Sequence, residues 1–501
     1  MFPFAYSQPV NLNLLNLFKI LFWVIITFTI VILGSVNTYA KGPSPYLPLQ
    51  MEPLIELELQ RLATVAKLPL LTKPYHAATV NRYLKSIVDS HPTLYRRINT
   101  YLKRYKQTAA LTHASIQLNY ANQENILLPN QRGQMADANY QASFTGFWQA
   151  NQYMIINAGA LYYENGDYLR NNTFVSFGAD VFQVDIGYRE HWLSPFQEGS
   201  VLLSTQAKPP LSVTISNPNL ITDFNIKYEM SLGLLDEQKG IRFDNDKPPV
   251  SGEPALLTMH LSAQPFDWWT IGFNRTFVFS GGEDSVSLGD IWNAIIDPVN
   301  SDNCVRDGNG DTELQDCSQE FGNQQASISN KFDLNWFDVP FSLYYEYAGE
   351  DTNNFSNYKL ANLANSFGLF LPYLGDSLSF NMEFTTFQSG WYTHHIYGEG
   401  YSNDGVKMGH WWGNKKDFND WVGGEAGSIR FDWQNSGDSQ ISLLYRTANF
   451  NQSSYADYQQ SHELEMKYHK AIDSNFLTLK LYLGRSNLGE NFVQTGISYT
   501  W

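Results

Sequence analysis

The stretch Asn491-Phe492-Val493-Gln494-Thr495-Gly496-Ile497-Ser498-Tyr499-Thr500-Trp501 decides the fold of this chain. Every second side chain from Val493 to Trp501 falls on one face of an extended strand, opposite small or polar residues. An unpaired apolar edge invites aggregation, whereas pairing the last strand with the first closes a barrel and removes that edge. The stretch therefore predicts the closing strand of a bacterial outer-membrane barrel.

The same period of two recurs from Leu111 onward. Leu257, Met259 and Leu261 alternate with polar residues, and later strands repeat the pattern. About 18 strands are expected, an even number that leaves both chain ends on the periplasmic side. The predicted fold class is all-β transmembrane: an antiparallel outer-membrane β-barrel with a small N-terminal periplasmic helical bundle.

Connections between these strands tend to alternate between short and long. Short periplasmic turns are expected at 149–151, 178–180, 336–339, 372–376, 435–438 and 472–474. Long outer connections are expected at 122–134, 190–209, 236–254, 281–322, 349–356 and 391–423.

Composition agrees with an exported barrel. The chain has 501 residues, of which 15% are aromatic, as many strands with interfacial girdles require. The mean hydropathy of -0.32 fits a barrel, since only alternate positions of its membrane-crossing part must be apolar. A net charge of -16 argues against non-specific nucleic-acid binding.

The first part of the chain predicts export followed by helices. Residues 1–40 resemble a signal peptide cleaved after Ala40, with an uncleaved anchor as the alternative reading. Residues 41–110 have a helical period, with helices near Pro53, after Pro74 and after Pro92. The last of these helices carries a basic outer face, which indicates a solvated surface, with contact to an acidic polymer or an inner-face partner as the alternative. Residues 111–501 form the predicted barrel.

Several separated motifs resemble the capsule-assembly protein Wzi family. They are Tyr188-Arg189-Glu190-His191-Trp192-Leu193-Ser194-Pro195-Phe196, Trp391-Tyr392-Thr393-His394-His395-Ile396-Tyr397-Gly398-Glu399-Gly400-Tyr401, Met408-Gly409-His410-Trp411-Trp412-Gly413, Trp269-Thr270-Ile271-Gly272-Phe273-Asn274-Arg275 and Tyr344-Tyr345-Glu346-Tyr347-Ala348-Gly349-Glu350-Asp351. The resemblance covers essentially the whole mature chain. It implies a non-enzymatic surface lectin that holds capsular polysaccharide or exopolysaccharide.

Candidate sugar-binding residues come from the outer stretches. Aromatic faces suit sugar C–H surfaces, and planar polar groups suit hydroxyls and carboxylates. The alternative for each aromatic residue is a place in the interfacial girdle. The predicted polysaccharide-binding residues are Arg189, His191, Trp192, Tyr392, His394, Tyr397, Tyr401, Lys407, Trp411 and Trp412.

Some histidine and acidic residues could suggest a metal site or catalysis. On a strand, the adjacent His394 and His395 would point to opposite faces and could not chelate one ion, and the adjacent Glu190 and His191 would be separated in the same way. Oxygen ligands at Asp307, Asn309, Asp311 and Asp316 suggest a calcium site, with an acidic surface loop as the alternative. Cys304 and Cys317 are expected to form a disulfide there.

The competing function is a porin or channel for small solutes or sugars. Arg446, Glu463, Glu465, Lys467 and Lys480 would line its aqueous lumen. Long outer loops and the helical bundle would oppose it by plugging both mouths. The expected partners are polysaccharide and outer-membrane lipid, for a monomeric protein that requires no cofactor.

Overall fold

The structure is a computed structural model that describes residues 42–164, 168–243, 247–282, 286–296, 321–353, 356–375, 377–436, 438–453, 456–473 and 475–501. The predicted signal peptide, the calcium ligands Asp307, Asn309, Asp311 and Asp316, and the Cys304–Cys317 pair lie outside the described residues. These expectations therefore stay predictions.

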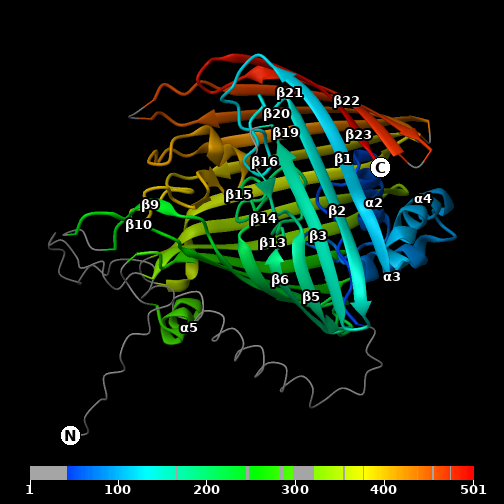
Figure 1. The fold of residues 1–501 in the computed structure, drawn as a ribbon, viewed down its shortest axis with the longest axis horizontal. Coiled ribbons are helices and arrows are strands. Elements are labelled where there is room, and N and C mark those ends of the chain that lie inside the picture. Colours follow the sequence, from blue (N-terminus) through cyan, green and yellow to red (C-terminus); the bar gives the residue numbers. More distant parts are fainter. Residues whose placement is uncertain are drawn as a thin grey trace, which may run out of the picture.

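The wall of the molecule is one closed antiparallel sheet (Figure 1). It contains 19 strands, but the two-residue β4 shares one position with β5, because both pair with β3, so the barrel has 18 strand positions. The prediction of about 18 strands is confirmed. The strands are β1 (Ala109–Ala121), β2 (Tyr140–Asn151), β3 (Met154–Tyr163), β4 (Tyr168–Leu169), β5 (Thr173–Ala179), β6 (Phe182–Tyr188), β7 (Leu211–Ser216), β8 (Lys227–Leu234), β11 (Ala255–Phe266), β12 (Trp269–Phe279), β13 (Gly322–Trp336), β14 (Val339–Asn353), β15 (Ser356–Leu374), β16 (Leu378–Phe387), β19 (Gly424–Ser436), β20 (Ser439–Phe450), β21 (Ser461–Ile472), β22 (Asn475–Arg485) and β23 (Asn491–Thr500).

The last strand closes the barrel, as the C-terminal sequence predicts. Strand β23 pairs with β1 from Ser115↔Thr500 to Ala121↔Gln494. Val493 and Ile497 are exposed on the outer face of the barrel, whereas Gln494 is fully buried inside. The alternation of the final stretch thus separates an apolar outer wall from a polar lumen.

Aromatic side chains mark both ends of the outer wall. Trp148, Trp336 and Trp433 are exposed near the short-turn end, and Tyr120, Tyr140 and Tyr162 are exposed near the long-loop end. Two such girdles flanking an apolar band are characteristic of outer-membrane barrels.

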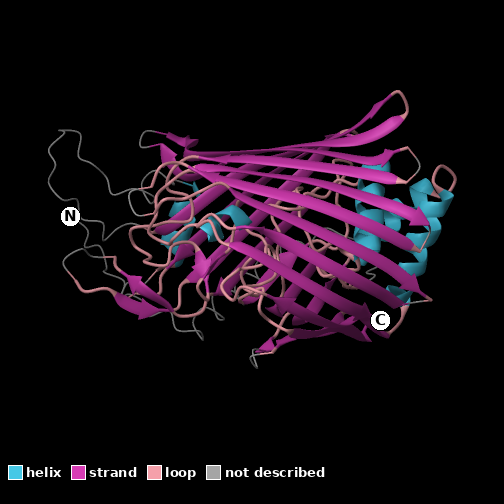
Figure 2. Ribbon diagram, turned by 90° about the horizontal axis from the view of Figure 1, so that it is seen from above, coloured by secondary structure: helices cyan, strands magenta, loops and turns pink. Residues whose placement is uncertain are grey.

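Three helices gather at the short-turn end of the barrel (Figures 1 and 2). They are α2 (Pro53–Val65), α3 (Ala77–Leu84) and α4 (Pro92–Leu102), with the 3-10 helices η1 (Lys85–Ile87) and η2 (Lys103–Lys106). Proline occupies the start of α2 and α4, where its missing N–H costs no hydrogen bond. All three helices lie where the sequence predicts them.

Helix α2 is also tied to the inner wall of the barrel. The Arg61 guanidinium donates to the Pro372 carbonyl oxygen at 3.1 Å and to Ser379 Oγ at 2.8 Å. Lys331 Nζ on β13 donates to the carbonyl oxygen of Ala63 at 2.9 Å. The helices therefore obstruct this end of the lumen. Within the described ranges, no helix is long and apolar enough to cross a membrane.

The long connections carry the remaining elements. They are the hairpin β9 (Gln238–Ile241) and β10 (Val250–Gly252), α5 (Leu288–Ile296), the hairpin β17 (Ser402–Asn403) and β18 (Val406–Lys407), and the 3-10 helix η4 (Trp411–Lys415). The expectation of a long connection at 349–356 is wrong, because β14 and β15 extend to Asn353 and from Ser356. Loop segments run inside the wall in Figure 2.

Candidate functional site

Two long connections fold back into the lumen. We call residues 189–210, between β6 and β7, the lumen loop, and residues 388–423, between β16 and β19, the outer loop. Buried residues of both loops, including Leu202 and Trp412, share one hydrophobic core. The long-loop end of the barrel is therefore packed with protein.

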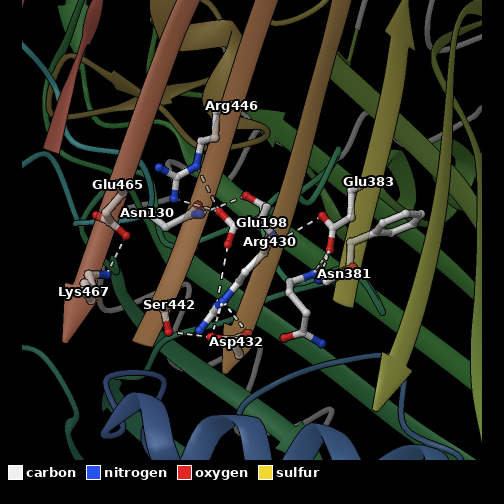
Figure 3. Close-up of polar contacts among 12 residues, drawn as sticks. Asn130, Glu198, Asn381, Glu383, Arg430, Asp432, Ser442, Arg446, Glu465 and Lys467 are labelled. Carbon is white, nitrogen blue, oxygen red and sulfur yellow. Dashed lines mark hydrogen bonds and ion pairs between the residues drawn. The ribbon is translucent and has the colours of Figure 1, made fainter. Parts of the chain in front are cut away.

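The tip of the lumen loop is held by a carboxylate of the wall (Figure 3). Glu383, on β16, accepts hydrogen bonds from three consecutive backbone N–H groups, those of Gln197 at 2.7 Å, Glu198 at 3.0 Å and Gly199 at 3.3 Å. Successive N–H groups that converge on one anion form a strong charge-assisted contact. The loop tip is thus fixed to one side of the barrel.

The same tip is also fastened to the neighbouring part of the wall. Both Arg446 Nε, at 3.0 Å, and Nη2, at 2.8 Å, donate to Glu198 Oε2. Arg430 Nη1 lies 3.9 Å from the other oxygen of Glu198 and is itself paired with Asp432 (Figure 3). Because Glu198 and Arg446 are buried, removing either would leave the other charge buried without its hydrogen-bonded partner.

The outer loop is organised around Tyr392, which is fully buried. Its hydroxyl donates to the carbonyl oxygen of Val201 in the lumen loop at 2.6 Å and accepts from the backbone N–H of His410 at 2.8 Å. A Cβ at Gly409 or Gly413 would overlap the Tyr392 ring. The two glycines of the 408–413 motif are therefore required by close packing, and Tyr392 links the two loops.

Lys407 has a structural role inside the outer loop. Its Nζ donates to the carbonyl oxygens of Gly413 at 2.9 Å, Lys416 at 2.7 Å and Asp417 at 3.1 Å. Burial lowers the pKa of Lys407. The ammonium group thus ties the loop together through backbone oxygens.

Arg189 and His191 meet on one carboxylate in the lumen. Arg189 Nη2 donates to Glu229 Oε2 at 2.7 Å, and His191 Nδ1 lies 2.8 Å from Glu229 Oε1. Trp192 donates from Nε1 to the Phe196 carbonyl oxygen at 3.1 Å. All three side chains hold the lumen loop in place.

The predicted sugar-binding residues are thus brought together mostly inside the molecule. Of the ten, only His394 is partly exposed, while the other nine are buried: Arg189, His191, Trp192, Tyr392, Tyr397, Tyr401, Lys407, Trp411 and Trp412. Their burial assigns them a supporting role in this conformation, and direct contact with a polysaccharide stays a prediction.

His394 and His395 differ from the expectation for a strand. They lie in an irregular part of the outer loop, and their rings stack with centroids 4.6 Å apart instead of pointing to opposite faces. In the part of the chain that the structure describes, no group of three or more His, Cys, Asp or Glu side chains is placed to hold a metal ion.

The buried His410 predicts sensitivity of the outer loop to acid. Burial lowers the pKa of His410 from 6.5 to about 3, so the folded state holds this proton less tightly than the unfolded state does. Its contribution to stability is complete above the unfolded pKa and falls as the pH drops from 6.5 toward 3.

We therefore expect His410→Asn to reduce the loss of stability between pH 7 and pH 5. Asparagine can still accept the hydrogen bond that His410 Nδ1 accepts from Trp412 N, at 3.1 Å. The measurement is the urea midpoint of the protein in detergent micelles at both pH values. His395→Asn, at an exposed position, is the control. Equal losses in wild type and His410→Asn would contradict the prediction.

A polar cavity of about 280 Å³ lies between the loops, α2 and the wall. Glu198, Arg430, Arg446, Glu465 and Lys467 are among its lining residues. The predicted pore-lining charges do face the lumen, but they are paired: Lys467 Nζ lies 2.7 Å from Glu465, Lys480 lies 3.6 Å from Glu465, and Glu463 binds Lys415.

Sequence reasoning missed Glu198, Glu383 and Arg430. One signal was available: Glu383 and Arg430 lie on the polar faces of their strands. A charged side chain that is buried there needs a partner of opposite charge or a hydrogen-bonding partner. Nothing in the sequence pairs Glu198 with Arg446, which lies 248 residues further along the chain.

Fold and lumen together define a closed, internally filled antiparallel barrel with an apolar outer wall, the class of outer-membrane barrels. The family model for capsule assembly protein Wzi matches residues 98–492. The chain belongs to this family, and its role is capsule assembly in the outer membrane. This is not a family of enzymes, so the non-enzymatic prediction is confirmed.

One solved structure agrees with the fold over nearly its whole length. Escherichia coli Wzi, described as a carbohydrate-binding β-barrel involved in group 1 capsule assembly, matches with a TM-score of 0.65 and 16% identity. The match covers 88% of this chain and 97% of that one. Pseudomonas aeruginosa OpdQ matches with a TM-score of 0.46 and 10% identity, over 78% of this chain and 97% of that one. A search of curated proteins gave no match.

Proposed function

We propose that the protein is a surface lectin that binds capsular polysaccharide or exopolysaccharide at its long-loop end and tethers it to the outer membrane. The observation that carries this proposal is the filled lumen, with the lumen loop fastened to Glu383 and Arg446 and helix α2 tied to the opposite end. Such a barrel is a rigid platform for loops and not an open channel. The carbohydrate binding described for Escherichia coli Wzi supports the same role.

The hairpin β9–β10 is the surface that we assign to the polymer. It packs beside the outer loop, where Arg242 N donates to the Ile396 carbonyl oxygen at 2.8 Å and Gly398 N to the Gly240 carbonyl oxygen at 3.1 Å. Lys239, Arg242 and His395 are exposed there. Cationic groups suit the carboxylates of acidic polysaccharides, and screening over about 8 Å weakens repulsion from the rest of this acidic protein.

The buried aromatic residues would support this surface from below. Tyr397 forms an isolated bridge with Ile241, and its ring packs edge-on against Phe243, with centroids 6.0 Å apart. Its hydroxyl donates to the Ser280 carbonyl oxygen at 3.1 Å. On this proposal, Tyr397 positions the hairpin, while Lys239, Arg242 and His395 touch the sugar.

We expect Lys239→Ala/Arg242→Ala to weaken polysaccharide binding. Each exposed charge contact contributes about 0.5–1 kcal/mol, so losing two should raise Kd about five- to thirtyfold. The measurement is equilibrium binding of the detergent-solubilised protein to polysaccharide purified from the medium of the source strain. In a strain lacking the gene, the same polymer should move from cells to medium with total synthesis unchanged.

The matched control is Arg96→Ala/Lys103→Ala, which removes two exposed cationic side chains from the helices at the other end of the barrel. This variant should bind as wild type does. Equal binding by both double variants would reject the hairpin as the contact surface, and unchanged polymer attachment in the deletion strain would reject tethering itself.

A further inference from the structure

Helix α5 lies on the outside of the barrel (Figure 1). Ile291, Ala294 and Ile295 pack against a cluster that contains Phe277 and Phe279. These two phenylalanines alternate along β12 with the lumen-facing Thr276 and Val278, so they belong to the outer wall. The helix therefore covers a patch of the surface that otherwise faces outward.

Both ends of α5 are capped. At its start, Ser287 N donates to Asp290 Oδ2 at 2.7 Å, and Asp290 N donates to Ser287 Oγ at 3.2 Å, which is a capping box. At its end, Arg275 of β12 donates to the carbonyl oxygens of Ile295 at 2.8 Å and Ala294 at 2.9 Å. The cation also suits the negative end of the helix dipole.

The contact with Arg275 fixes the depth of α5 on the wall. Arg275 lies four residues before the end of β12 at Phe279, a distance of roughly 10 Å along the barrel axis for a strand tilted by about 40°. Leu261 and Phe273, which pair directly with each other on the next outward-facing level, are 52% exposed each. The C-terminal end of α5 is thus continuous with the exposed apolar wall.

The outward face of α5 is itself apolar at this end. Trp292 is 62% exposed and Ile296 is 55% exposed, whereas the polar Ser287 and Asp290 lie at the opposite end of the helix. A short helix that is apolar on two faces needs a second apolar neighbour. In membrane proteins, Trp usually lies at the membrane–water interface and Ile in the hydrocarbon region.

We propose that α5 is embedded in the outer leaflet, where Trp292 and Ile296 contact lipid acyl chains and the helix shields Arg275 from hydrocarbon. The occupant of the face is lipid because the exposed Leu261–Phe273 pair next to it lies on the membrane-facing wall of an outer-membrane barrel. An uncovered arginine in the apolar band of such a barrel would cost stability. The connection between β12 and β13 thereby adds an anchor to the barrel.

The test is photo-cross-linking in phosphatidylcholine–phosphatidylglycerol vesicles. A benzophenone amino acid replaces Trp292 or Ile296, with Phe273 as the membrane-facing control and Glu237, exposed on a long connection, as the aqueous control. Adducts are identified by mass spectrometry after irradiation.

We expect lipid adducts at positions 292 and 296 in yields comparable with position 273, and none at position 237. Lipid adducts at 273 without any at 292 or 296 would overturn the proposal, because α5 would then lie in water. Cross-linked dimers from position 296 would also overturn it, since a second copy of the chain would then cover the helix. In each of these outcomes, lipid adducts at position 273 show that the barrel has inserted into the vesicle membrane.

Discussion

Glu198→Ala is expected to detach the tip of the lumen loop and to lower the free energy of unfolding by about 3–5 kcal/mol. The loss exceeds that of an ordinary surface ion pair because Arg446 would stay buried without the carboxylate oxygen to which two of its nitrogens donate. The measurement is urea unfolding of the protein in lipid vesicles. Faster proteolysis within 189–210 should accompany the lost stability.

The control for this prediction is Glu198→Leu/Arg446→Leu. Replacing both partners of a buried ion pair by apolar side chains removes the uncompensated charge, so the double variant should recover much of the stability that Glu198→Ala loses. Arg430 keeps Asp432 as its partner in both variants. If the double variant were as unstable as Glu198→Ala, the effect would come from something other than the ion pair.

Tyr392→Ala is expected to have a comparable effect at the long-loop end. Truncation of a large, fully buried aromatic side chain typically costs about 3–5 kcal/mol, and here it also removes the link between the two loops. Tyr392→Phe keeps the ring and loses only the contacts of the hydroxyl, at about 1 kcal/mol for each hydrogen bond. In planar-bilayer recordings, the wild-type protein should show no large, steady currents. The Tyr392→Ala variant should show intermittent currents, because the loops that fill the lumen are no longer linked.

The Gly413 position offers an independent check on this packing. Gly413→Ala should destabilise the wild-type protein because the new Cβ would overlap the Tyr392 ring. In the Tyr392→Ala background the same change should be tolerated, since the ring is gone. Identical costs in both backgrounds would contradict the proposed contact between the two residues.

Much of the fold follows from local patterns in the sequence. The period of two identifies wall strands such as β23, the helical stripe after Pro92 identifies α4, and alternation of short and long connections gives the orientation of the strands. These features depend on neighbouring residues, which is why sequence alone reveals them. Strand ends are less predictable, as β14 and β15 show by continuing through a stretch expected to be a loop.

The arrangement of the candidate site depends on distant residues and could not be predicted in the same way. The sequence identifies the aromatic and basic outer stretches. Burial of Tyr392 and Lys407, however, results from the folding back of the lumen loop and the outer loop, which are separated in the sequence by about half the length of the barrel domain. The amino-acid composition of a loop does not determine whether the loop faces solvent or folds into the lumen. Exposed cations such as Lys239 and Arg242 lack any motif that would distinguish them from other surface charges.

The attachment of α2 to the inner wall also determines the order in which the molecule can assemble. The Arg61 guanidinium binds the Pro372 carbonyl oxygen, Ser379 and Gln434, which follow it by 311, 318 and 373 residues. These partners are synthesised more than 300 residues after Arg61, so α2 leaves the export channel long before its polar face has anywhere to bind. Contacts across such separations form slowly. The newly exported chain therefore carries a charged helix that waits in water until the final third of the sheet arrives to enclose it.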